Sequence, residues 1–382
     1  MGACDSSIQN RKIIPNNHIN NNTTTEYSGY FSSSSLPTIS SSVFPQNNNS
    51  HISKKHNSTE KTYPLEDKQY ILPERIAKRE DITKKYKISK TLLGDGATAL
   101  VYLAENSNKE KFAIKRILKD KIISNRQKKT VKEAETCLKL KNKNIINHYE
   151  VYEDIHYISI VMELGDTDLF ELIIKSPFGV IPEEIAVDFL IQIFESIDYL
   201  HNVQNIVHCD IKPENYVVIF DKNNNKKPIL KLVDFGNIRK KPINKERLFN
   251  FCGTKEYMAP EAMENYGFNE KVDEWAAGII MFNMLTGADP FMSDTDSQYR
   301  ENIKFKEIKF EYIHNEKLRE LNKKLLNRYM AKRITAKEAL EELKSIKNDL
   351  NSNYNINISR NKKEDEENWN NIKNKISLMN IS

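Results

Sequence analysis

The sequence predicts an α+β protein in which a β-rich region precedes a helical one, with a polar tail at each end. Short alternating or apolar runs dominate the chain up to residue 164, and stretches with helical spacing dominate from residue 168 onward. The two ends are rich in Asn, Ser and Lys and have few apolar residues with which to bury a core. We therefore expect disordered tails over residues 1–85 and 347–382, around one folded domain at residues 86–346.

The β-rich region begins with a predicted hairpin. Residues 86–93 alternate apolar and polar side chains, Gly94 and Gly96 mark a turn, and residues 97–103 form the second strand. Further elements follow: strands at residues 111–117 and 157–164, and a helix at residues 124–141.

In the helical region, the clearest amphipathic stretch is Glu183–His201, which follows the helix-starting Pro182. A pair of strands is expected at residues 216–220 and 229–233. The polar turn between them begins like a calcium-binding loop, but it lacks Gly at the sixth place and has Leu232 where Glu belongs at the twelfth. The sequence therefore predicts no calcium site in this turn.

Composition excludes several classes of function. The 382 residues carry a net charge of +5, with no basic stripe interleaved with aromatic residues, so we expect no nucleic-acid partner. The four cysteines are spaced too widely for a metal site or a disulfide framework, which indicates a reducing compartment. The chain has neither a run of about 18 apolar residues, as a membrane span requires, nor a signal-peptide core.

The first residues match a lipid-attachment pattern. Gly2 follows the initiator Met with Ser6 four places on, as in N-myristoylation, and Cys4 lies where palmitate is often added. One acyl chain binds a membrane only marginally, whereas two anchor stably. We therefore expect Gly2 and Cys4 to hold the protein at the cytoplasmic face of a membrane, in particular the plasma membrane. The alternative is a chance match to a short pattern.

The most informative motif lies at residues 207–215, Val-His-Cys-Asp-Ile-Lys-Pro-Glu-Asn. It places Asp210, Lys212 and Asn215 at offsets of zero, two and five on one short loop. One such loop alone could arise by chance, so its meaning depends on the motifs around it.

Other motifs stand in matching order around this loop. Lys115 ends the run Phe-Ala-Ile-Lys upstream, and Asp234-Phe235-Gly236 and Ala259-Pro260-Glu261 lie downstream. Together the motifs resemble those of the eukaryotic-type serine/threonine protein kinases over residues 86–346. The resemblance implies a two-lobed protein-kinase fold that uses ATP and Mg²⁺ to phosphorylate Ser and Thr hydroxyls of protein substrates.

The resemblance also assigns roles within the catalytic loop. Asp210 is the catalytic base or orients the hydroxyl, Lys212 steadies the transferred phosphoryl group, and Asn215 and Asp234 bind Mg²⁺. Thr254, in the run before Ala259-Pro260-Glu261, is typical of serine/threonine kinases.

Lys115 is expected to contact the α- and β-phosphates and to pair with a Glu of the following helix. Glu133 is the preferred partner because Asn144-Ile145 follows it at the family's spacing, and Glu135 is the rival. The resemblance further predicts a buried pair between Glu261 and Arg333, and a central helix from Asp273 that ties down the catalytic loop.

The remaining nucleotide-binding residues fall into three groups. Those of the glycine-rich loop cover the phosphates, those of the hinge with the gatekeeper Met162 hold the adenine, and apolar residues sandwich its ring while an acid approaches the ribose. The glycine-rich loop contains Leu93, Gly94 and Gly96 with Val101, and the gatekeeper and hinge are Met162, Glu163 and Gly165. Ala113, Val101 and Val217 sandwich the ring or are plain core, and Asp168 approaches the ribose.

Within the superfamily, Tyr257–Phe291 resembles the calcium/calmodulin-dependent and calcium-dependent kinases, and the acylated start resembles calcium-dependent kinases of apicomplexan parasites. No EF-hand loop follows the kinase region, so direct calcium control is not implied. Asp168 and Glu214 favour basic substrates. Trp369, Ile372, Ile376 and Met379 recur at helical spacing, which fits a calmodulin-like regulator's target, a segment docked on the kinase or a solvated tail.

Several residues depart from the family pattern. Ala99 replaces the third glycine of the phosphate loop, His148 a Leu between the lobes, and Cys209 the Arg that receives an activation-loop phosphate. That loop has no Ser, Thr or Tyr between Gly236 and Gly253. The loop thus lacks a residue to phosphorylate, and position 209 lacks the Arg that would bind the phosphate. These two absences fit each other and predict activity without loop phosphorylation. The rival interpretation is a catalytically impaired, membrane-tethered scaffold.

Overall fold

The structure is a computed structural model that describes residues 71–96, 99–122, 124–220, 227–244 and 246–357. Gly2 and Cys4, which are predicted to carry lipid, and the tail around Trp369 lie outside these ranges. None of the helices in the described ranges is long and apolar enough to cross a membrane.

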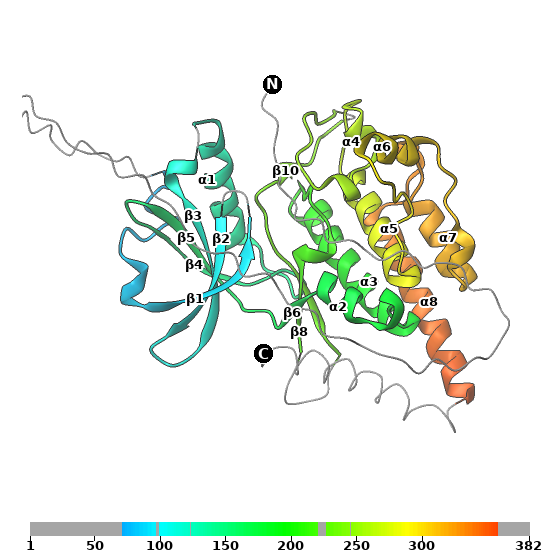
Figure 1. Ribbon diagram of the computed structural model, residues 1–382, viewed down its shortest axis with the longest axis horizontal. Coiled ribbons are helices and arrows are strands. Elements are labelled where there is room, and N and C mark those ends of the chain that lie inside the picture. The colour runs from blue at the N-terminus through cyan, green and yellow to red at the C-terminus, as the bar shows by residue number, and fades with distance from the viewer. Residues whose placement is uncertain (1–70, 97–98, 123, 221–226, 245, 358–382) are drawn as a thin grey trace, which may run out of the picture. The chain divides into compact units, whose positions relative to one another are not determined.

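The N-terminal lobe is a five-stranded antiparallel sheet with one helix beside it (Figure 1). The strand order is β1-β2-β3-β5-β4, so β3 lies at the centre, and β5 beside it is buried at five of its six residues. The elements are β1 (Tyr86–Asp95), β2 (Ala99–Asn106), β3 (Lys111–Leu118), α1 (Ser124–Lys139), β4 (His148–Glu153) and β5 (Tyr157–Met162), with short 3₁₀ turns η1 (Ile82–Lys84) and η2 (Lys119–Lys121).

The C-terminal lobe is mainly helical (Figure 1). Its helices are α2 (Leu169–Lys175), α3 (Glu183–Asp198), α4 (Pro260–Met263), α5 (Lys271–Thr286), α6 (Asp296–Phe305), α7 (Glu316–Leu325) and α8 (Ala336–Asn357). The lobe also contains two small sheets. One consists of β6 (Thr167–Asp168), β8 (Tyr216–Ile219) and β9 (Ile229–Leu232), and the other of β7 (Ile206–Val207) and β10 (Arg239–Lys240).

Helix α5 is the centre of this lobe. It is apolar on almost every side, so it is buried from Val272 to Met284 between α3 and α7. Its Trp275 stacks on Phe291 with a centroid distance of 5.6 Å. The helix ends at Gly287, whose left-handed φ of 68° provides the cap. Through Asp273 the helix is hydrogen-bonded to the backbone of His208 and Cys209.

The predicted α+β fold with a β-rich and a helical lobe is confirmed, and the expected strands and helices lie within a few residues of their predicted bounds. Sequence analysis did not name β4. It also assigned residues 71–85 to the polar lead, whereas the structure packs Leu72, Ala77 and Ile82 into the N-terminal lobe. At the other end, α8 continues to Asn357, past the expected boundary at residue 346.

Candidate active site

Three distant segments meet at Lys115. The Nζ atom of this β3 residue lies 2.6 Å from Glu133 Oε1 on α1 and 2.8 Å from Asp234 Oδ1. Burial disfavours the charge on Lys115, but the carboxylates of Asp234 and Glu133 outweigh it and raise the pKa of the amine. In turn, Lys115 holds the pKa of Asp234 well below its usual range. Lys115 and Asp234 therefore stay in the ionic form that phosphate and metal binding needs, whereas burial raises the pKa of Glu133.

The structure settles which glutamate of α1 reaches the site. Glu133 is buried and points to Lys115, whereas Glu135 lies on another face and pairs with Arg75 at 2.7 Å. Successive residues of a helix point about 100° apart, so residues two apart, such as Glu133 and Glu135, point to nearly opposite sides. Both glutamates therefore cannot face Lys115.

The catalytic loop brings Asp210, Lys212 and Thr254 together. Asp210 Oδ1 accepts hydrogen bonds from the Thr254 N–H at 3.0 Å and from its hydroxyl at 2.9 Å. Lys212 Nζ donates to the same hydroxyl at 2.8 Å and lies 3.9 Å from Asp210 Oδ2. Besides Lys212, Oδ2 has contacts at 3.5 Å with the amides of Asn215 and Asn237. It is therefore less tightly bound by its described neighbours than Oδ1 is.

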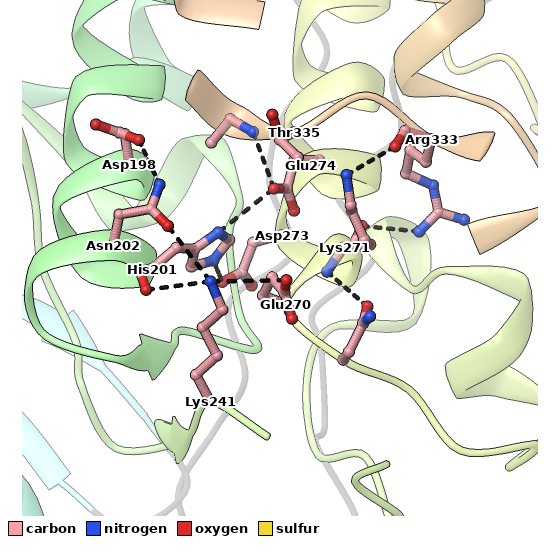
Figure 2. Close-up of polar contacts among 12 residues, drawn as sticks. Asp198, His201, Asn202, Lys241, Glu270, Lys271, Asp273, Glu274, Arg333 and Thr335 are labelled. Carbon is pink, nitrogen blue, oxygen red and sulfur yellow. Dashed lines mark hydrogen bonds and ion pairs between the residues drawn. The ribbon is translucent and has the colours of Figure 1, made fainter. Parts of the chain in front are cut away.

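Helix α5 fixes the catalytic loop through Asp273. Asp273 accepts the backbone N–H groups of His208 and Cys209 at 2.7 and 2.9 Å, and it lies 2.8 Å from His201 Nε2. Burial opposes charge on His201, but the carboxylates of Glu274 and Asp273 raise its pKa to about 10. Figure 2 shows this imidazole between the two acids, and the raised pKa favours its protonated form, which offsets part of their negative charge.

Asp234 and Asn215 have the chemistry of a Mg²⁺ site. Asn215 donates its amide N–H to the Asp210 carbonyl at 2.8 Å, which leaves the amide oxygen as its ligand atom, and 43% of the Asp234 side chain is exposed. Mg²⁺ binds few protein oxygens and completes its shell with water and phosphate. Within the described ranges no three acidic, His or Cys side chains converge on a metal, so substrate phosphates would have to supply the other ligands.

The residues predicted to form the hinge contact both lobes. Met162 is the cross-strand partner of Ala113 on one side and His148 on the other. The Glu163 side chain accepts hydrogen bonds from Asn147 and Lys231, both at 2.8 Å, and so joins the two lobes. A Cβ on Gly165 would lie 2.7 Å from Val217 Cβ, so only glycine permits this close approach.

The other nucleotide-site residues have these surroundings. Gly94 pairs with Val101 across β1 and β2, the Gly96 N–H donates to the Ala99 carbonyl at 3.0 Å, and Leu93 is exposed. Asp168 caps α2 by accepting the Glu171 N–H at 2.8 Å, so one of its oxygens is already used.

Two departures from the family pattern are buried. The His148 ring lies 5.9 Å from the Phe235 ring, and His208 packs on Phe235 at 5.4 Å. Burial, aided by the charge of Lys115, lowers the pKa of His148 to about 3, so the ring packs as a neutral aromatic group. Burial likewise raises the pKa of the Cys209 thiol, which is inert.

Sequence analysis missed two contributors. Asn237 reaches Asp210, and its place directly after Asp234-Phe235-Gly236 was the available signal. The second is Arg239, whose guanidinium donates to the Phe249 carbonyl at 2.9 Å and to the Asn250 carbonyl at 3.5 Å. The predicted buried pair of Glu261 and Arg333 is confirmed, at 2.7 and 3.0 Å.

The two-lobed fold and this constellation define the class of protein kinases. Comparison with known proteins agrees: residues 86–343 match the family described as the protein kinase domain, and the chain belongs to that family.

The chain is similar to several serine/threonine kinases. Serine/threonine-protein kinase dkf-2 of Caenorhabditis briggsae is 33% identical over 61% of this chain and 19% of its own. Serine/threonine-protein kinase 33 of Bos taurus is 34% identical over 65% and 53%. Calcium/calmodulin-dependent protein kinase type 1 of Macrobrachium nipponense is 30% identical over 68% and 74%. The chain thus spans about half or less of the length of the first two relatives and about three quarters of the third.

Proposed function

We propose that the protein is a serine/threonine kinase that transfers the γ-phosphoryl group of Mg-ATP to protein hydroxyls. The observation that carries the proposal is the meeting of Lys115, Glu133 and Asp234, at 2.6 and 2.8 Å, from three distant segments of the chain. A lone exposed ion pair contributes little, but here Glu133 is buried and Lys115 nearly so. Such a costly arrangement fits a phosphate-binding site better than a structural one.

Each of these residues has a separate role in phosphoryl transfer. Lys115 holds the nucleotide phosphates, and Asp234 and Asn215 hold the metal, whose charge neutralises the transferred group. Asp210 orients the acceptor hydroxyl with Oδ2 and takes its proton, since Thr254 occupies Oδ1. Lys212 lies beside both and offsets the negative charge that develops there.

A transfer assay on the purified full chain tests this proposal. With Mg-ATP and a basic Ser/Thr peptide, phosphopeptide should form, and chelation of Mg²⁺ should stop it. Nucleotide binding without any transfer would contradict the proposal and support the catalytically impaired scaffold. The observation that favours the scaffold is the buried His148 Nδ1, which has no hydrogen-bond partner among the residues that the structure describes.

The proposal extends to location and partners. The Gly2 and Cys4 pattern supports attachment to the cytoplasmic face of the plasma membrane, and the exposed Glu214 supports basic protein substrates. The name of the crustacean relative and the spacing around Trp369 support a calmodulin-like regulator. Titration of a peptide of residues 366–382 with calmodulin, with and without Ca²⁺, tests that last point, and absence of calcium-dependent binding would remove it.

A further inference from the structure

A segment that precedes the kinase domain is built into the N-terminal lobe. Residues 71–80, termed here the bracing segment, lie before the family match, which starts at residue 86. Leu72 and Ala77 are 2% and 4% exposed, in a cluster with apolar residues of four elements. The cluster partners include Ile117 of β3, Ala134 of α1, Val151 of β4, and Ile158 and Ile160 of β5.

The bracing segment is fastened to β4 by a buried carboxylate. Glu153 is 0% exposed, and its two oxygens accept the backbone N–H groups of Ile71 at 2.6 Å and Leu72 at 2.9 Å. Lys119 Nζ balances the charge at 2.9 Å. The Lys78 N–H donates to the Val151 carbonyl, and the Lys78 carbonyl accepts the Glu153 N–H, both at 2.9 Å. If the bracing segment moved away, the buried Glu153 carboxylate would lose two donors, which is strongly destabilising. This cost holds the segment in place.

The same segment contacts α1 next to the active site. Three successive residues of the helix face three partners: Glu133 meets Lys115, Ala134 enters the cluster of Leu72 and Ala77, and Glu135 pairs with Arg75 at 2.7 Å. A rotation of α1 about its axis that withdraws Glu133 from Lys115 would also break the contacts of the two following residues with the bracing segment.

We propose that the bracing segment positions α1 for phosphoryl transfer, with Leu72 as the main positioning residue and Arg75 as a second. By joining β4 to the outer faces of α1, it fixes the rotation of the helix at which Glu133 holds Lys115. The inference rests on the proposed kinase activity, but it concerns residues outside the family match and away from the substrates.

The main test compares two equivalent Leu→Ala changes in the full chain. Leu72→Ala removes the brace, and Leu343→Ala removes a fully buried leucine of α8, remote from the site. Both should lower the melting temperature. Only Leu72→Ala should raise the KM for ATP, speed hydrogen exchange of α1 amides and lower kcat/KM on the order of tenfold, since displacement of positioned groups by about 1 Å costs up to about 100-fold. Leu72→Met should restore wild-type values.

A surface pair supplies a test in which folding is not at risk. Arg75 is 73% exposed, so Arg75→Glu should fold, yet it places like charges together and should lower kcat/KM about two- to threefold. The double variant Arg75→Glu/Glu135→Arg should recover the loss.

The outcomes separate the two proposals. An inactive wild type would overturn the proposed function. An active wild type whose Leu72→Ala variant keeps its KM for ATP and its α1 exchange rates, as Leu343→Ala does, would overturn the positioning role, and so would a charge reversal that fails to rescue Arg75→Glu.

Discussion

At the scale of single residues, Asp234 has the most demanding surroundings in the site. Its φ of 61° is unusual for a residue with a side chain, and the conformation turns the carboxylate toward Lys115 while the Gly236 N–H donates to it at 3.2 Å. Backbone strain of this kind persists only where other contacts enforce it. Here the enforcing contacts are those that the proposed metal and phosphate binding requires.

We expect Asp234→Ala to lower kcat at least about 100-fold, as loss of one preorganised charged group typically does. The domain should stay folded, because the change removes a half-exposed carboxylate and not core volume. Lys115→Met, from the other end of the ion pair, should act in the same direction. Steady-state kinetics with circular dichroism check this, with the exposed Asp296→Ala as a matched control. Near-normal turnover in both site variants would mean that the site is wrongly assigned.

His148 should make stability depend on pH in the acid range. Its folded pKa of about 3 lies below the model-peptide value of 6.5, so below pH 6.5 protons bind the unfolded chain first and favour unfolding. At pH 5 this costs about 2 kcal/mol, at about 1.4 kcal/mol per pH unit. The variant His148→Leu should therefore gain more stability at pH 5 than at pH 8. Urea unfolding of both proteins at the two pH values measures this, and an equal gain at both would refute the buried neutral imidazole.

At the scale of elements, the activation segment is held without a phosphate. Arg239 of β10 binds the carbonyls of Phe249 and Asn250, and the Asn250 N–H donates to the Asn265 side chain at 3.0 Å. The Arg that would receive a phosphate is replaced by the buried Cys209. Neutral carbonyls thus take the place of the anion that orders this segment in many kinases.

Activity should therefore survive complete dephosphorylation. Protein made in bacteria and treated with phosphatase should keep its kcat within about twofold, whereas Arg239→Met should lower it more, because the segment loses an anchor. Mass spectrometry must show that Thr254 and Tyr257 carry no phosphate. Loss of most activity on phosphatase treatment would contradict this account.

The elements also show what sequence can and cannot predict. Strands such as Lys111–Leu118 were predictable because their apolar runs are local, and Asp210, Lys212 and Asn215 because their spacing is fixed by one loop. The bracing segment was not, since its few apolar residues resemble those of a polar lead. The segment is held in place by Glu153, some eighty residues away in the sequence. A contact between such distant residues produces no periodic pattern in the sequence.

At the scale of the whole molecule, lipid attachment would determine where the activity is used. We expect Gly2→Ala to move a tagged protein from the membrane to the soluble fraction, because the acceptor of myristate is lost. Cys4→Ser should give partial release, since one acyl chain binds reversibly. Fractionation of cells expressing each variant measures this, and the transfer activity of the released protein should be unchanged. A wild type found only in the soluble fraction would exclude the anchor.

The row of side chains across β3, β5 and β4 has a consequence for inhibitor design. Ala113, Met162 and His148 are successive cross-strand partners, so a compound that extends from the adenine site past Met162 comes upon an imidazole. Its Nδ1 is buried and has no hydrogen-bond partner among the residues the structure describes. Kinases with leucine at this place offer such a compound only apolar surface. A small polar group placed against His148 would therefore raise the affinity of the compound for this protein by a hydrogen bond to Nδ1. The same group would lower its affinity for kinases with leucine, where it would be buried without a partner, and the difference gives selectivity.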